Sequence, residues 1–320
     1  MPGSKSHLEG EPSGARMRRR GGAAHSSNAG RHPAAEPPTI SGRWLLGAVA
    51  VTLAAAVVCA WGALCLLFWQ GSWQLLYHPR SAVTRTPASM GLAFDTVGFA
   101  ASDAGTPQLR GWWINAPPDA RLKRLTVVYL HGQDGNLSNT LDVLAHLHAA
   151  GMNVLAFDYR GYGQSQFVRP SETHWRQDAE WALAYLTGTR HVAADTIVLD
   201  GTGLGANLAL EVASVHPELA GVIVSFPLAD ATSAIFSDAR ARLVPARLLV
   251  RDRFDLDAAA GRVRIPVLWV TPKTPDTPHE PTAYEKVGSR KMLVQDSSTA
   301  GEDPPLNDAW MRWLDELPAH

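Results

Sequence analysis

The sequence predicts an α/β domain with a largely parallel sheet of about eight strands, placed after one transmembrane helix. Two observations predict this organisation. Along residues 91–320, short apolar runs alternate with stretches of helical spacing, as in βαβ repetition. Before them lies one uncharged run of 26 residues, Trp44–Trp69. We therefore divide the chain into a basic tail (1–43), a transmembrane helix (44–69), a juxtamembrane connector (70–90) and the domain (91–320).

The uncharged run has the properties of a retained membrane anchor. It is longer than the roughly 20 residues that span a bilayer and the roughly 7–15 residues of a signal-peptide core. Its orientation follows from the distribution of Lys and Arg. The tail contains seven of these basic residues, and the segment after the helix contains Arg80 and Arg85. The positive-inside rule then predicts a cytoplasmic N-terminus and an extracytoplasmic domain, periplasmic if the source is bacterial.

The tail itself has the composition of an unfolded segment. It is rich in Gly, Ser, Pro and Ala, with few large apolar side chains to bury. Its charge is concentrated at Arg16 and 18–20, which we interpret as a solvated cytoplasmic feature. A patch for anionic lipid or nucleic acid is the weaker alternative.

Composition narrows the possible partners and cofactors. The formal net charge is −1, so no excess of positive charge indicates nucleic-acid binding. Cys59 and Cys65 both lie in the apolar run, and this leaves the domain without a disulfide framework or a cysteine metal site. The sequence predicts no cofactor. Its expected partners are the bilayer, through residues 44–69, and an unidentified small-molecule or protein ligand.

The domain is predicted element by element from its periodicity. Residues 125–130 are almost continuously apolar, which is typical of a strand buried on both faces. The other predicted strands are Ala93–Phe99, Leu109–Asn115, Asn153–Asp158, Thr196–Asp200, Leu219–Phe226, Pro266–Val270 and Met292–Gln295. Helical spacing predicts helices over Ser138–Ala150, Glu172–Leu186, Leu204–Val215, Pro281–Val287 and Asn307–Leu317. Residues 229–263 interrupt the alternation, and we expect them to form a small cap over the carboxyl ends of the strands.

Several motifs together resemble the α/β-hydrolase superfamily, and more narrowly its membrane-anchored serine aminopeptidase-like branch. The resemblance covers roughly residues 68–318, in the segments Leu75–Pro79, Leu109–Trp112, Tyr129–Gly132, Phe157–Ser165, Pro170–Glu172, Arg251–Asp255 and Ile265–Leu268. It implies that the His131-Gly132 turn precedes an oxyanion hole. The two donors would be the backbone N–H groups of Gln133 and Leu204.

The same resemblance implies a serine nucleophile at a position where this chain has glycine. The expected G-x-S-x-G elbow reads Gly201-Thr202-Gly203-Leu204-Gly205 here, between a predicted strand and helix. Gly203 can adopt the strained elbow backbone, but it has no side chain to attack a carbonyl. Thr202 carries the nearest hydroxyl, and we expect its side chain to point away from the elbow tip.

The other two triad positions also depart from the family pattern. The position expected for the acid is Pro275, and Asp276 follows it by one residue. The position expected for the base is occupied by Glu302. A carboxylate near pKa 4 is a weak base toward a hydroxyl. His279 is the only other histidine whose predicted place is near the acid position.

Two functional hypotheses follow. The first is a pseudo-hydrolase, a membrane-tethered binding or scaffolding domain with no intact catalytic residue. The second is an active hydrolase of acyl ester, amide or thioester bonds in which Glu302 or Asp276 activates water. Two further hypotheses are weaker. One is a metal site on loop residues, but these show no metal-ligand spacing, so we expect no metal (Asp276, His279, Glu280, Glu302 and Asp303). A phosphate site at 201–205 lacks the P-loop lysine.

Overall fold

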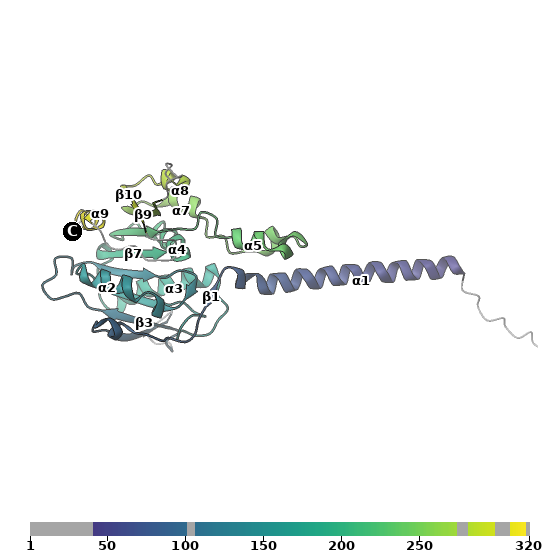
Figure 1. The fold of residues 1–320 in the computed structure, drawn as a ribbon, viewed down its shortest axis with the longest axis horizontal. Helices are drawn as coiled ribbons and strands as arrows, with labels where there is room; N and C mark the ends of the chain where they lie inside the picture. Colours follow the sequence, from purple (N-terminus) through teal and green to yellow (C-terminus); the bar gives the residue numbers. More distant parts are fainter. Residues whose placement is uncertain (1–40, 101–105, 274–280, 298–307, 318–320) are drawn as a thin grey trace, which may run out of the picture. The chain divides into compact units, whose positions relative to one another are not determined.

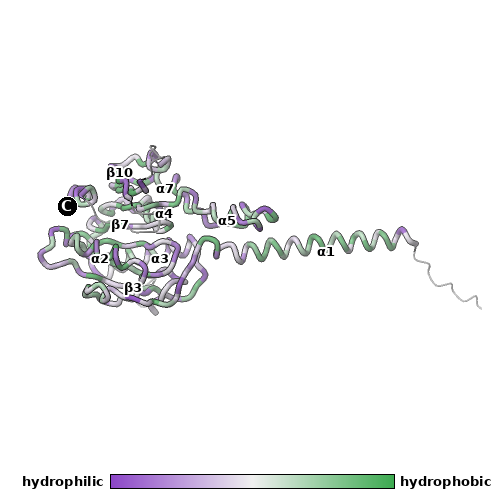
Figure 2. Tube along the Cα trace, in the orientation of Figure 1, coloured by the Kyte–Doolittle hydropathy of each residue, from purple (hydrophilic) through white to green (hydrophobic). Residues whose placement is uncertain are grey.

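The computed structural model describes residues 41–100, 106–273, 281–297 and 308–317. The chain divides into two compact units, Met1–Ala54 and Ala55–His320. Helix α1, Gly42–Gly71, begins in the first unit and ends in the second. Its large apolar side chains are mostly exposed, and Figure 2 shows apolar residues along its length. By length and composition it is apolar enough to cross a membrane, and the span over 44–69 stays a prediction.

An eight-stranded sheet forms the centre of the second unit, with strand order β10-β9-β8-β7-β4-β6-β3-β2. The pairs from β10 to β6 are parallel, and β3 pairs antiparallel with both β6 and β2. The predicted fold class is thus confirmed. The strands are β2 Asp95–Phe99, β3 Leu109–Ile114, β4 Thr126–Leu130, β6 Asn153–Asp158, β7 Ile197–Thr202, β8 Gly221–Ser225, β9 Val267–Pro272 and β10 Lys291–Asp296.

Helices cover both faces of this sheet, because alternate strand residues point into two apolar clusters. In β4, Val128 packs in one cluster and Val127 in the other. The first cluster includes residues of α3, α4, α7 and α8, and the second includes residues of α2 and α9 (Figure 1). Their bounds are α2 Leu141–Ala149, α3 Glu172–Ala184, α4 Leu204–Ala213, α7 Leu256–Arg262, α8 Thr282–Lys286 and α9 Asp308–Asp315. Complete burial of the central strands explains their continuous apolar sequence.

Short helical turns connect these elements. A π-helical turn, Tyr185–Thr189, extends α3, so the predicted helix over 172–186 ends in a different geometry. The 3-10 turns are η1 Ser72–Leu75, η2 Pro87–Met90, η3 Leu137–Asn139, η5 Ala194–Thr196 and η6 Ala239–Arg242.

The segment after β8 contains two short helices before α7 begins. We call residues 233–250 the insert; it comprises α5 Ser233–Ser237, η6 and α6 Ala246–Leu249. Helix α5 contacts η1, the turn that follows α1. Helix α7, by contrast, packs on α4 and α8 in the body of the domain. The expectation that 229–263 caps the strands stays a prediction.

A second, two-stranded sheet ties the juxtamembrane connector to the loop after β4. In it β1, His78–Pro79, pairs in parallel with β5, Asp134–Gly135. The backbone N–H of His78 also donates to the carbonyl oxygen of Gln133 at 3.0 Å. The connector is therefore hydrogen-bonded directly to the residues that follow the His131-Gly132 turn.

Candidate functional site

The strand-to-helix turn at 201–205 has the backbone of a nucleophile elbow. Gly203 has φ 55° and ψ −124°, a conformation that residues with a side chain rarely adopt. Its N–H donates to the carbonyl oxygen of Ser225 at 3.0 Å, which fixes the turn against β8. The flanking glycines are required by close packing, since a Cβ on Gly205 would overlap the carbonyl of Leu130. The turn is preserved, and its tip bears no hydroxyl.

The space above the elbow is partly filled by the side chain of Gln133. The backbone N–H of Leu204 donates to Oε1 of Gln133 at 3.3 Å. A Cβ built on Gly203 would also lie 3.3 Å from this oxygen. The resemblance implies that Leu204 donates to a substrate oxyanion, but here an amide oxygen of the protein itself accepts that hydrogen bond. Such an arrangement satisfies the donor without ligand.

A cavity of about 180 Å³ opens at this point. It brings together five of the residues that the sequence singled out, at the carboxyl ends of β4, β7 and β8 (His131, Gly132, Gln133, Thr202 and Gly203). Its lining consists of Tyr129, His131, Gly132, Gln133, Asp134, Asn139, Thr140, Thr202, Gly203, Phe226 and Leu228. The position agrees with the general rule that ligands bind at the carboxyl edge of such sheets.

Thr202 does not supply the missing nucleophile geometry. It belongs to β7, one residue before the elbow tip, and its Oγ1 has no hydrogen-bond partner among the described residues. No described imidazole or carboxylate therefore activates this hydroxyl, and an unactivated threonine is a poor nucleophile.

The buried pair His131 and Asp158 lies beneath the cavity. The Nδ1–H of His131 donates to the carbonyl oxygen of Gly132 at 2.8 Å, and its Nε2 lies 3.6 Å from Oδ1 of Asp158. Burial lowers the pKa of His131 to about 4 and raises the pKa of Asp158 to about 7. His131 is thus a neutral structural histidine at neutral pH, held against the loop that carries Gln133.

Three sequence-predicted positions, Pro275, Asp276 and Glu302, lie outside the described residues, as do the remaining candidate metal ligands. Among the residues that the structure describes, no group of three or more His, Cys, Asp or Glu side chains could hold a metal ion. The described part of the site therefore consists of the elbow, the loop after β4 and the end of β8.

Sequence reasoning missed two residues that shape this cavity. Phe226 follows β8 with φ 51°, an unusual conformation for an aromatic residue, and it lines the cavity. For Gln133 the family resemblance implies a role for the backbone N–H only, and not for the side chain. For Gln133 the available signal was a long polar side chain immediately after the His-Gly turn. No local sequence pattern indicates positive φ at Phe226.

The strand order and the glycine elbow together define an α/β-hydrolase fold. A family model described as "Serine aminopeptidase, S33" matches residues 122–270. The uncharacterized protein YfhR of Salmonella typhi is 30% identical over 207 residues, covering 60% of this chain and 67% of that protein. The chain belongs to the α/β-hydrolase superfamily, in its serine aminopeptidase S33 branch.

Other comparisons agree with this assignment. The α/β hydrolase domain-containing protein WAV2 of Arabidopsis thaliana is 26% identical over 43% of this chain and 44% of its own length. Among solved structures, a Pyrococcus furiosus esterase aligns with a TM-score of 0.54, 17% identity and coverage of 70% and 89%. An α/β hydrolase from Vibrio vulnificus aligns with a TM-score of 0.51, 20% identity and coverage of 72% and 80%. At these identities the solved structures show the fold alone.

Proposed function

We propose that this chain is a membrane-tethered member of the α/β-hydrolase family that lacks serine-hydrolase activity and acts as a binding or scaffolding domain. The observation that carries the proposal is the elbow itself. Gly203 keeps the backbone conformation of the nucleophile position but offers no oxygen to form an acyl-enzyme. The bond from Leu204 to Gln133 supports the same conclusion, because one oxyanion donor is already satisfied.

The cavity favours a small ligand as the occupant. Its volume of about 180 Å³ is below the roughly 300–1,000 Å³ of typical ligand pockets, so it accommodates a small molecule or one side chain of a protein partner. Asn139 and Thr140 line it beside the apolar Phe226 and Leu228, whereas Oγ1 of Thr202 is itself buried. We propose no nucleic-acid partner, since the net charge is −1.

The tether and its orientation belong to the same proposal. Helix α1 supplies the single membrane span, and the tail of 1–43 with seven basic residues lies on the cytoplasmic side. The domain then lies outside the cytoplasm, in the periplasm if the source is bacterial.

Ester hydrolysis by the full-length chain tests the proposal directly. The protein is purified in detergent, and hydrolysis of p-nitrophenyl butyrate is compared with that of a heat-denatured control and of the variant Glu302→Gln. The expected result is no hydrolysis above the control. A rate above the control that is lost in Glu302→Gln overturns the proposal and supports the carboxylate-assisted hydrolase.

The double variant Gly203→Ser with Glu302→His measures how much of the ancestral site remains. A serine Cβ fits at 203 once the flexible end of Gln133 moves slightly from its 3.3 Å position. If the double variant hydrolyses the ester and the native chain does not, only the triad was lost. If neither the native chain nor the double variant hydrolyses the ester, the pocket has diverged further.

A further inference from the structure

Exposed apolar side chains of the domain gather near the end of α1. Outside that helix, four large apolar side chains of the described residues are strongly exposed: Phe167 at 91%, Leu248 at 83%, Leu243 at 62% and Val215 at 58%. Leu243 and Leu248 belong to the insert. Isolated exposed apolar residues need no explanation, but two of these four lie in the insert, and Phe167 lies two residues before Arg169, which is bonded to α1.

Leu243 is bonded to α1 itself. The indole N–H of Trp61 donates to its carbonyl oxygen at 3.1 Å. Trp61 precedes Gly71, the last residue of α1, by ten positions, or about 15 Å at 1.5 Å per residue. Residues 42–61 already provide about 30 Å, enough to span a hydrocarbon core. The insert is therefore bonded to the far part of the predicted span 44–69, beyond the roughly 20 residues that a hydrocarbon core requires.

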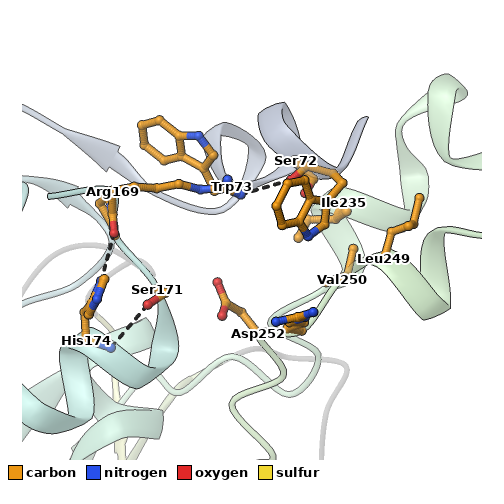
Figure 3. Close-up of a pocket in the computed structure, with 12 residues that line it drawn as sticks. Ser72, Trp73, Arg169, Ser171, His174, Ile235, Leu249, Val250 and Asp252 are labelled. Carbon is orange, nitrogen blue, oxygen red and sulfur yellow. Dashed lines mark hydrogen bonds between the residues drawn. The ribbon is translucent and has the colours of Figure 1, made fainter. Parts of the chain in front are cut away.

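Phe167 is attached to the same end of the helix through Arg169. The guanidinium group of Arg169 donates to the carbonyl oxygen of Trp69 at 3.0 Å and lies 5.9 Å from the rings of both Trp69 and Trp73. Figure 3 shows Arg169 and Trp73 on one side of a pocket whose other side is formed by Ile235, Leu249 and Val250. The loop at 167–169 and the insert thus pack around one segment, the end of α1.

The insert also carries a concentration of positive charge. It contains three arginines and one aspartate, and Arg251 and Arg253 follow it directly, whereas the whole chain is close to neutral. One arginine, Arg240, forms an exposed bidentate pair with Asp238. Arg242 and Arg247 flank the exposed Leu243 and Leu248. Interleaved arginine and leucine side chains are typical of helices that lie in a membrane interface, and guanidinium groups bind lipid phosphates well.

We propose that Phe167, Leu243 and Leu248 form a second membrane contact, which docks the domain on an anionic phospholipid bilayer beside its own span. The apolar side chains enter the acyl-chain boundary, and Arg242 and Arg247 contact headgroup phosphates. This inference rests on the proposed membrane tether. It adds that the insert is a membrane-docking element and that the domain is held against the surface.

Depth-dependent fluorescence quenching tests the contact in the full-length chain. Cys59 and Cys65 are replaced by alanine, and a single cysteine is introduced by Leu248→Cys and labelled with an environment-sensitive fluorophore. The chain is reconstituted in vesicles of phosphatidylcholine and phosphatidylglycerol containing a lipid that carries a nitroxide quencher high in its acyl chain. Val215→Cys provides the matched control, since Val215 is similarly exposed but lies just after α4.

The proposal predicts strong quenching at 248 and little at 215. Equal and weak quenching at both positions, in protein that still floats with the vesicles, overturns the docking contact and leaves the tether intact. Protein that fails to float with the vesicles overturns both. Arg242→Gln with Arg247→Gln should reduce the docked population by about fivefold per residue in anionic vesicles, as expected for one basic side chain near such a surface. An equal loss in pure phosphatidylcholine contradicts the role given to lipid charge.

Discussion

The backbone N–H of Leu204 donates to Oε1 of Gln133 at 3.3 Å, so the loop after β4 is linked to the start of α4 through a side chain. In an active serine hydrolase this N–H faces the developing oxyanion. Here its acceptor is a side chain of the protein. The elbow of this chain thus has glycine at the position where the family resemblance implies a serine, and one of its two expected oxyanion donors is engaged by the protein itself.

Replacing Gln133 by alanine should free this donor and strengthen anion binding at the elbow. A hydrogen bond is worth about 0.5–1.5 kcal/mol net, so we expect the affinity for a short carboxylate such as butyrate to rise by roughly 3–10-fold. Titration of the full-length chain, followed by the amide shift of Leu204, measures this. Gln133→Glu is the matched control because it keeps an acceptor and adds negative charge, and it should bind butyrate more weakly than the native chain. Unchanged affinity in Gln133→Ala would show that the bond to Leu204 does not compete with ligand.

Gly203→Ala should destabilise the domain through its backbone. A φ of 55° with ψ −124° costs a residue with a side chain about 1–3 kcal/mol. The only side chain that a Cβ would approach is the flexible end of Gln133, so crowding adds little. Gly188→Ala is the control, because Gly188 has no positive φ and a Cβ there meets nothing within 4 Å. Urea unfolding of both variants in detergent checks this, and equal free energies of unfolding contradict it.

The sequence was sufficient for the sheet and the elbow because both depend on local signals. The run at 125–130 is apolar throughout, since β4 is buried on both faces. The glycines at 201, 203 and 205 are in register with the strand-to-helix turn. The pairing of His78–Pro79 with Asp134–Gly135 could not be predicted, because two-residue strands have no periodicity and their partners are distant in sequence.

The same limit applies to the side chain of Gln133. Its hydrogen bond exists only because two loops that are 71 residues apart meet at the sheet edge. No local pattern encodes that meeting. Residues 275, 276 and 302 stay sequence predictions, since they lie outside the described part of the chain.

Asp178→Ala should be among the most destabilising single changes in the domain. Asp178 is fully buried and accepts hydrogen bonds from the backbone N–H of Arg160 at 2.8 Å and from its Nε at 2.5 Å. Truncation leaves the buried guanidinium without its carboxylate, which costs about 3–5 kcal/mol. The exposed pair of Lys286 and Asp257, at 2.7 Å, supplies the control Asp257→Ala, for which we expect at most about 1 kcal/mol. Chemical denaturation measures both, and a similar loss in the two variants would contradict the importance of burial.

Replacing His131 or Asp158 should give stability profiles with opposite dependence on pH. Burial raises the pKa of Asp158 from 3.8 to about 7, so the folded state keeps a proton that the unfolded state loses between these values. The contribution of Asp158 to stability is therefore lost as pH rises from about 4 to about 7. Burial lowers the pKa of His131 from 6.5 to about 4, so its contribution is gained as pH rises through about 4–6.5.

In the native chain the two contributions oppose each other and largely cancel between about pH 4 and 6.5. Asp158→Asn removes the falling contribution, so relative to the native chain its free energy of unfolding should change with pH more positively, by at most about 1.4 kcal/mol per unit. His131→Asn removes the rising contribution, so relative to the native chain its free energy of unfolding should change with pH more negatively over about pH 4–6.5. Urea titrations of the two variants and the native chain at several pH values in detergent measure these slopes. If the free energy of unfolding depends on pH in the same way in both variants, the two buried groups do not titrate independently, which contradicts the prediction.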